Sequence, residues 1–248
     1  MLNAIPNHTN VVAAEAEADA GAAGEGAAPG GNAHSAVAPG GVAARIAQRT
    51  LARRETRYAG EVRRLLDAAL AVMRSCGTTS RPRVADIVAA AGLSNDAFYR
   101  HFPSKDALVA ALLEDGTERL QSYLVHQMAK EATPEGKVRR WVEGVLAQAA
   151  DEDIAATTLA VLWNGGSVGE ALPAGRPSAS RPLAELLHAP FAELGSPAPE
   201  LDASLAAHAV VGQLSDFLWQ RTRPSSEQID HVAHVCLAIA AARTGEAG

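Results

Sequence analysis

The chain has 248 residues, of which 48% are hydrophobic and only 4% aromatic, and its formal net charge at pH 7 is −6. Alanine supplies much of the hydrophobic fraction, which favours helices over strands. The sequence contains neither the roughly eighteen consecutive apolar residues of a membrane span nor the pattern of a secretory signal. We therefore expect an all-α, cytoplasmic protein with one large or two small domains.

Positive charge is concentrated in one part of this acidic chain. Residues 43–105 carry 12 Lys and Arg against 5 Asp and Glu, a net of +7, which leaves −13 for the remainder. Because local basic groups displace counterions from phosphates, this distribution favours a nucleic-acid-binding region beside a separate acidic domain.

Residues 1–55 are expected to form a disordered Ala/Gly-rich arm that ends in a basic segment. Residues 1–42 hold four acidic residues and no Lys or Arg, and they offer too little apolar area to offset the entropy of ordering. The basic segment contains Arg45, Arg49, Arg53, Arg54 and Arg57. It is either a solvated basic helix or tail, or an arm that holds phosphates or enters the minor groove.

The first helix of the next region is expected from about Glu61 to Cys76, with apolar residues at helical spacing. Its apolar stripe consists of Val62, Leu65, Leu66, Ala69, Val72 and Met73. Gly77 ends this helix, and Arg81 and Arg83 come before the second helix, where they place positive charge near an approaching duplex.

Residues 84–105 predict two short helices joined by a tight turn. Gly92 ends the first helix, Leu93 is the apolar residue of the turn, and the Ser94 hydroxyl can cap the second helix. On the second helix the expected buried residues are Phe98 and Phe102, and the expected outward residues are Asn95, Asp96, Tyr99 and Arg100. A rigid helix with such a polar face is typical of a helix-turn-helix that enters the DNA major groove.

The run from Glu61 to about Leu113 resembles the N-terminal DNA-binding domain of the TetR family of bacterial transcriptional regulators. The matching motifs are Gly-Leu-Ser, Phe-Tyr-Arg-His-Phe and Ser-Lys-Asp-Ala-Leu. The resemblance implies a three-helix DNA-binding domain at 56–103 and a helical ligand-binding and dimerisation domain at 104–248. It also implies a repressor that binds a palindromic operator as a homodimer and is released from DNA by a small molecule. The apolar composition of the chain favours an apolar or amphipathic ligand.

The resemblance places the second helix of the motif against DNA. Asn95 suits adenine, whereas Asp96 either accepts from cytosine or only complements the helix dipole. Arg100 can contact a base or the backbone. The full predicted set of DNA contacts, with Tyr99, His101 and Lys105 at phosphates, is Arg57, Arg81, Arg83, Ser94, Asn95, Asp96, Tyr99, Arg100, His101 and Lys105. Ala85 departs from the family pattern, in which several members have a polar residue there.

The rest of the chain predicts further helices with apolar stripes. A helix that begins after Pro103 forms the covalent connection between the two domains. The other helices are expected at about 135–150, 154–163, 183–194 with a break at Pro190, 199–221 and 226–243, with a loop at 167–182. The last two are apolar on several sides, which suggests a four-helix interface between two chains, or else a pair buried within one subunit.

Large and polar side chains of the C-terminal domain are candidates for the ligand site that the resemblance implies, although residues of these types are more often ordinary core. They are Tyr123, His126, Trp141, Trp163, Asn164, Gln213 and Phe217.

Other function classes have little support in the sequence. We find no metal-ligand spacing and no nucleophile motif, so we expect no enzyme activity, no cofactor and no metal. Cys76 and Cys236 are interpreted as reduced, buried thiols. The alternative function is a helix-turn-helix interaction module that acts through a protein partner without a small-molecule effector.

Overall fold

The computed structural model describes residues 41–165 and 180–241, and all regular elements in these ranges are helices. The all-α prediction is confirmed for this part of the chain. The described residues 41–60 belong to one compact unit, and those from Glu61 onward belong to another. Within the described ranges no helix is long and apolar enough to cross a bilayer, and no three metal-ligating side chains cluster. The predicted disorder at 1–40 and most of the predicted loop 167–182 lie outside the described residues.

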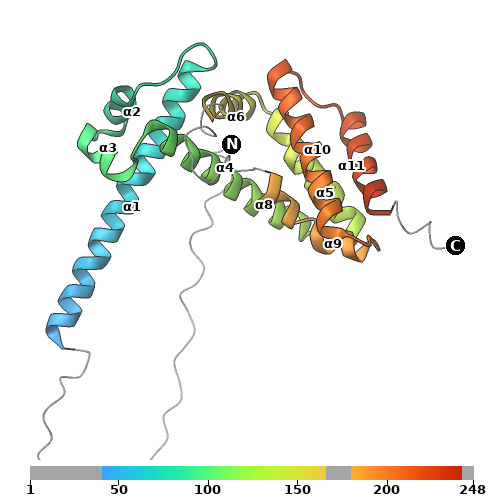
Figure 1. The fold of residues 1–248 in the computed structure, drawn as a ribbon, viewed down its shortest axis with the longest axis horizontal. Coiled ribbons are helices and arrows are strands. Elements are labelled where there is room, and N and C mark those ends of the chain that lie inside the picture. Colours follow the sequence, from blue (N-terminus) through green and yellow to red (C-terminus); the bar gives the residue numbers. More distant parts are fainter. Residues whose placement is uncertain (1–40, 166–179, 242–248) are drawn as a thin grey trace, which may run out of the picture. The chain divides into compact units, whose positions relative to one another are not determined.

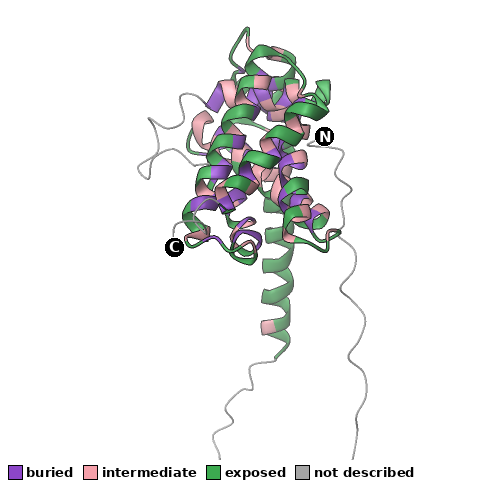
Figure 2. Ribbon diagram, turned by 90° about the vertical axis from the view of Figure 1, so that its right-hand side faces the viewer, coloured by how far each residue is buried: buried purple, intermediate pink, exposed green. Residues whose placement is uncertain are grey.

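The first helix, α1, runs from Val42 to Cys76, so it begins well before the predicted start at Glu61. Residues 42–55, which we expected to end a disordered arm, are helical instead. The physical reason is local: this segment contains no glycine or proline and is rich in Ala and Arg, which favour helices. Figure 2 shows the residues before Glu61 almost entirely exposed.

The helix-turn-helix has its own hydrophobic core. Part of α1 packs there with α2 (Val84–Ala91), α3 (Asn95–His101) and the beginning of α4 (Lys105–Met128) (Figure 1). The core contains the predicted apolar residues Leu65, Leu66, Ala69, Met73, Ile87, Val88, Ala91, Phe98, Phe102, Leu108 and Leu112. Apolar residues of α6 (Glu152–Gly165) complete it, a contact that the sequence did not predict.

A second core lies among the remaining helices, α5 (Pro134–Leu146), α6 (Glu152–Gly165), α8 (Ser180–Glu185), α9 (His188–Glu193), α10 (Pro199–Gln220) and α11 (Ser226–Ala241). A single 3₁₀ turn, Ala147–Ala149, follows α5. Figure 1 shows α5, α10 and α11 side by side, and each of these helices contacts the other two. The largest side chains buried in this core are Trp141 and Phe191, both 0% exposed.

Two predicted boundaries in this region were wrong. The helix expected from Leu183 begins at Ser180, within the predicted loop. The break expected at Pro190 lies earlier, between Glu185 and His188. Pro190 instead lies in the first turn of α9, where a proline is tolerated because that turn needs no N–H donor to the preceding residues.

The two cysteines are free thiols, as predicted. Cys76 is half-buried, whereas Cys236 lies within the C-terminal core. Burial raises the pKa of the Cys236 thiol to about 11, so it stays protonated at neutral pH.

The turn between α2 and α3 requires a left-handed residue. Gly92 has φ 62° and ψ 38°, and a Cβ added to it would meet no atom within 4 Å. Any cost of substitution at Gly92 therefore comes from the backbone conformation and not from crowding.

We expect Gly92→Ala to lower the free energy of unfolding by about 1–2 kcal/mol. Gly92→Asn is the matched control and should cost less, because asparagine adopts the left-handed region more readily. Urea unfolding of both variants checks this. Equal losses in the two variants would contradict the assignment of the cost to the backbone of Gly92.

Candidate DNA-binding interface

The geometry of the helix-turn-helix follows from caps at its turn. At the end of α2 the Gly92 N–H donates to the Ala89 carbonyl at 3.2 Å, and the Leu93 N–H donates to the Val88 carbonyl at 2.9 Å. Ser94 then begins α3, and its Oγ accepts the Ala97 N–H at 3.2 Å. The predicted roles of Gly92 and Ser94 in the turn are confirmed. Because Ser94 caps α3, its hydroxyl is already engaged within the protein.

The two faces of α3 differ as the sequence predicted. Phe98 is 0% exposed and packs its ring 5.9 Å from that of Phe102. Tyr99 is 58% exposed, although the edge of its ring contacts Phe98 at a centroid distance of 5.2 Å. The exposed residues of the helix, which we call the α3 polar face, are Asn95, Asp96, Tyr99 and Arg100.

His101 does not belong to this face, which corrects the prediction of a phosphate contact. Its side chain is 0% exposed, and its Nε2 lies 2.9 Å from Glu61 Oε2 of α1. The Glu61 side chain is itself only 8% exposed, and Arg100 NH1 lies 3.7 Å from the same carboxylate oxygen. A buried imidazole on a buried carboxylate cannot reach a phosphate. Its role is to anchor the end of α3 to α1.

Nothing in the sequence pattern indicated the contact between Glu61 and His101. The partners are 40 positions apart, and helical spacing alone does not tell which side of α1 faces the end of α3. Glu61 was identified only as the expected start of a helix.

The predicted cations around α3 have different surroundings. Arg83 is exposed at the N-terminus of α2. Arg81 is exposed too, and its guanidinium carbon lies 5.7 Å from the centre of the Trp163 ring. Lys105 is half-buried at the start of α4, with Nζ 3.5 Å from the Pro82 carbonyl. Arg57 is exposed in the unit that precedes Glu61.

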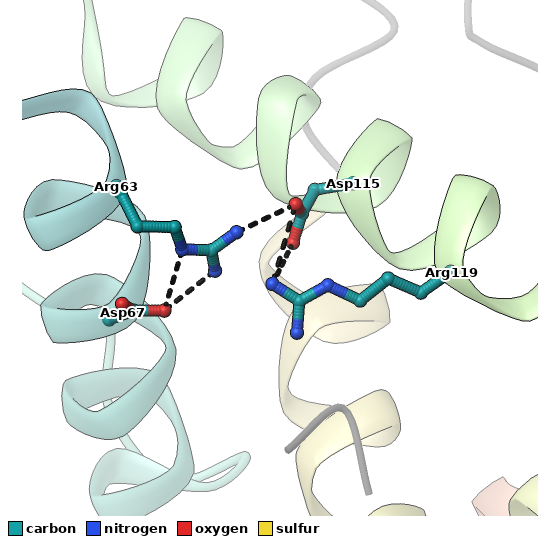
Figure 3. Close-up of polar contacts among 4 residues, drawn as sticks. All are labelled: Arg63, Asp67, Asp115 and Arg119. Atoms are coloured by element: carbon teal, nitrogen blue, oxygen red, sulfur yellow. Dashed lines mark hydrogen bonds and ion pairs between the residues drawn. The ribbon is translucent and has the colours of Figure 1, made fainter. Parts of the chain in front are cut away.

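An ion-pair network joins α1 to α4 (Figure 3). Arg63 contacts Asp67 of its own helix at 2.6 Å and Asp115 of α4 at 2.9 Å. Arg119 contacts the other oxygen of Asp115 at 3.1 Å. The hydrogen bond to Asp67, followed by the interactions with Asp115, raises the pKa of Arg63 above its ordinary value. Arg63 is thus engaged in linking helices of the protein.

A second set of contacts joins the helix-turn-helix to α6. Ala160 and Val161 of α6 belong to the helix-turn-helix core, and Arg74 at the end of α1 forms an ion pair with Asp153. The contact between Arg81 and Trp163 adds a third link. Whereas α4 is the covalent connection, α6 holds the same domain through side chains.

The predicted ligand residues separate into three groups. His126 and Gln213 are exposed, and their contact with a ligand stays a prediction. Trp141 is fully buried, and its indole N–H donates to the Leu183 carbonyl at 3.0 Å, as a core tryptophan does. The half-buried aromatic residues are Tyr123, Trp163 and Phe217.

Asn164 stands apart from the other candidates. It is 5% exposed, and its amide Nδ2 donates to the Ala160 carbonyl at 2.9 Å. Its Oδ1 is buried without a hydrogen-bond partner among the described residues, and so is Thr158 Oγ1 on the same helix. An unpaired buried acceptor costs free energy, so such atoms are reasonable positions at which to expect a hydrogen-bonding ligand or water.

Comparison with known proteins agrees with the arrangement of the N-terminal helices. Residues 65–112 match the family model described as bacterial regulatory proteins, tetR family. No curated protein gave a significant match to the chain.

Solved structures share the fold at low sequence identity. A protein from Mesorhizobium loti described as a TetR-family transcriptional regulator has a TM-score of 0.55 and 18% identity, over 75% of this chain and 97% of that one. The fatty acid degradation regulator FadR from Bacillus halodurans has a TM-score of 0.50 and 17% identity, over 70% and 96%. Reduced NemR from E. coli has a TM-score of 0.50 and 15% identity, over 72% and 96%. The helix-turn-helix at residues 65–112 is therefore similar to the DNA-binding domain of the bacterial regulatory proteins of the tetR family, and the chain shares its fold with these solved structures.

Proposed function

We propose that this protein is a transcriptional repressor that binds a palindromic operator as a homodimer and is released by a small ligand. The observation that carries the proposal is the α3 polar face, which is exposed on a helix fixed by buried Phe98. A short, rigid helix with exposed polar side chains in its first turn fits the major groove.

Each exposed residue of α3 has a distinct part in this proposal. Asn95 lies in the first turn and can form a bidentate pair with adenine. Asp96 shares that turn, where its charge also complements the helix dipole without any DNA. Tyr99, Arg100 and Lys105 hold the backbone, with Arg81 and Arg83 nearby on the loop before α2.

The homodimer is supported by apolar side chains that the chain leaves exposed. On α10, Leu201 is 57% exposed, Leu205 is 55% exposed and Trp219 is 52% exposed. Leu201 and Trp219 are separated by about five turns and so share one side of the helix. Val235 of α11 is 41% exposed. A helix pair buried within one subunit would cover these side chains, so their exposure favours a second copy over that alternative.

The ligand proposal is supported by α6. Its buried Asn164 Oδ1 lacks a partner among the described residues, while Ala160, on the same helix, packs in the helix-turn-helix core. A ligand that donates a hydrogen bond to Asn164 would therefore act on a helix that holds the DNA-binding domain. Its remaining surface should be apolar, as the apolar composition of the chain favours. A compound that raises the melting temperature and also dissociates DNA would identify it, provided that Asn164→Leu loses both effects.

The experiment on α3 uses a duplex selected from a random library by the wild-type protein. We expect Asn95→Ala to lose about 1–3 kcal/mol of discrimination at one base pair. Tyr99→Ala should instead weaken binding to all sequences by a similar factor, because a phosphate contact carries no sequence information. Exposed Ser122 on α4 provides the control, Ser122→Ala. If Asn95→Ala keeps the wild-type base preference at every position, Asn95 does not contact a base.

Introducing a charged side chain on the exposed side of α10 tests whether this helix forms the dimer interface. We expect Leu205→Glu to convert the protein to monomers and to lower its DNA affinity about tenfold or more, because the second half-site is then bound independently. The matched control is Val125→Glu on α4, which changes a side chain that is 51% exposed. Sedimentation equilibrium and gel shift check both variants. A dimeric Leu205→Glu variant, or a monomeric wild type, would rule out this interface.

A further inference from the structure

The part of α1 before Glu61 carries arginines at every fourth position. Arg45, Arg49, Arg53 and Arg57 form this series, which we call the arginine row. A step of four residues rises about 6 Å and turns about 40° more than once around a helix, so the row winds gradually through about 120° from Arg45 to Arg57. All four side chains belong to exposed residues.

Negative charge is scarce along this segment. Residues 42–60 contain five arginines and a single acidic residue, Glu55. Glu55 lies two positions after Arg53, which puts it about 160° away around the helix, outside the row. Like charges four residues apart destabilise a helix, so binding of the row to phosphates would relieve part of this repulsion.

We propose that the arginine row binds consecutive phosphates of the DNA duplex to which α3 binds. From Arg45 to Arg57 the helix rises about 18 Å, roughly half of one turn of B-DNA. Arginine suits this task because its planar guanidinium can pair with a phosphate through two parallel hydrogen bonds. The inference rests on the proposed function and extends the contact surface beyond the helix-turn-helix.

A membrane surface is the other anionic partner to consider. A helix that lies on a membrane needs one wide apolar face opposite its cations. The exposed apolar residues here are Val42, Ile46, Leu51 and Tyr58. Ile46 and Leu51 are five positions apart, about 140° around the helix, so these side chains form no single face. The pattern favours DNA.

The test measures how the affinity of the full chain for a 40-base-pair duplex of random sequence depends on salt concentration. Each arginine that neutralises a phosphate should contribute about 0.9 to the slope of log affinity against log salt. We expect the slope to fall by about 3–4 for each bound subunit, and so by about 7 for the proposed homodimer, when all four arginines of the row are changed to glutamine. Glutamine has a helix propensity close to that of arginine, and circular dichroism checks that the helix persists.

Arg49 and Arg181 give a matched control. Arg49 is in the row, whereas Arg181 lies on α8, with the same charge and exposure class. Arg49→Gln, present in both subunits of the proposed homodimer, should lower the slope by about 1.8, and Arg181→Gln should leave it at the wild-type value.

The outcomes separate this inference from the proposed function. A wild type that binds no duplex at low salt would defeat both. If the wild type binds and Tyr99→Ala weakens it, but the four-arginine variant keeps the wild-type slope, only the arginine row is overturned. The arginine row is also overturned as a DNA contact if phosphatidylserine vesicles bind the wild type but not the four-arginine variant, while the salt slope of this variant on DNA equals that of the wild type.

Discussion

The position of α3 depends on the burial of Phe98. A helix of seven residues is too short to be stable alone, so tertiary contacts must hold it. Phe98 is 0% exposed, and burial of such a side chain contributes about 1.5–3 kcal/mol. With Phe98 directed into the core, Asn95 and Tyr99 are exposed on the remaining surface of the helix. The contact of His101 with Glu61 then fixes the far end of α3.

The helix-turn-helix domain also contacts α4 and α6, and the two contacts differ in how easily they rearrange. Asp115 of α4 binds Arg63 of α1 through ion pairs at the surface. On the other side, Val161 of α6 packs in the helix-turn-helix core. Polar surface contacts rearrange at small cost, whereas packed apolar contacts tolerate little displacement. A ligand beside Asn164 would therefore change the orientation of the DNA-binding domain mainly through α6.

Local sequence was sufficient for the helix-turn-helix because its elements are determined by neighbouring residues. Gly92 ends one helix, Ser94 begins the next, and the spacing of Phe98 and Phe102 defines the buried side. Long-range pairing was not accessible in this way. His101 has a side chain that suits a phosphate, and only the fold shows that it is buried on Glu61. The early start of α1 did not follow from hydrophobic periodicity, because the exposed segment before Glu61 has no apolar stripe, and only its helix propensity favours a helix there.

The proposed function requires that the α3 polar faces of both subunits lie in the major groove of one duplex. Dimethyl sulfate footprinting of a duplex selected by the full-length protein tests it directly, since the reagent methylates guanine N7 in that groove. The account predicts protection at two related half-sites whose centres are about one helical turn or more apart. A bound duplex without major-groove protection, or with protection at a single site, would contradict it.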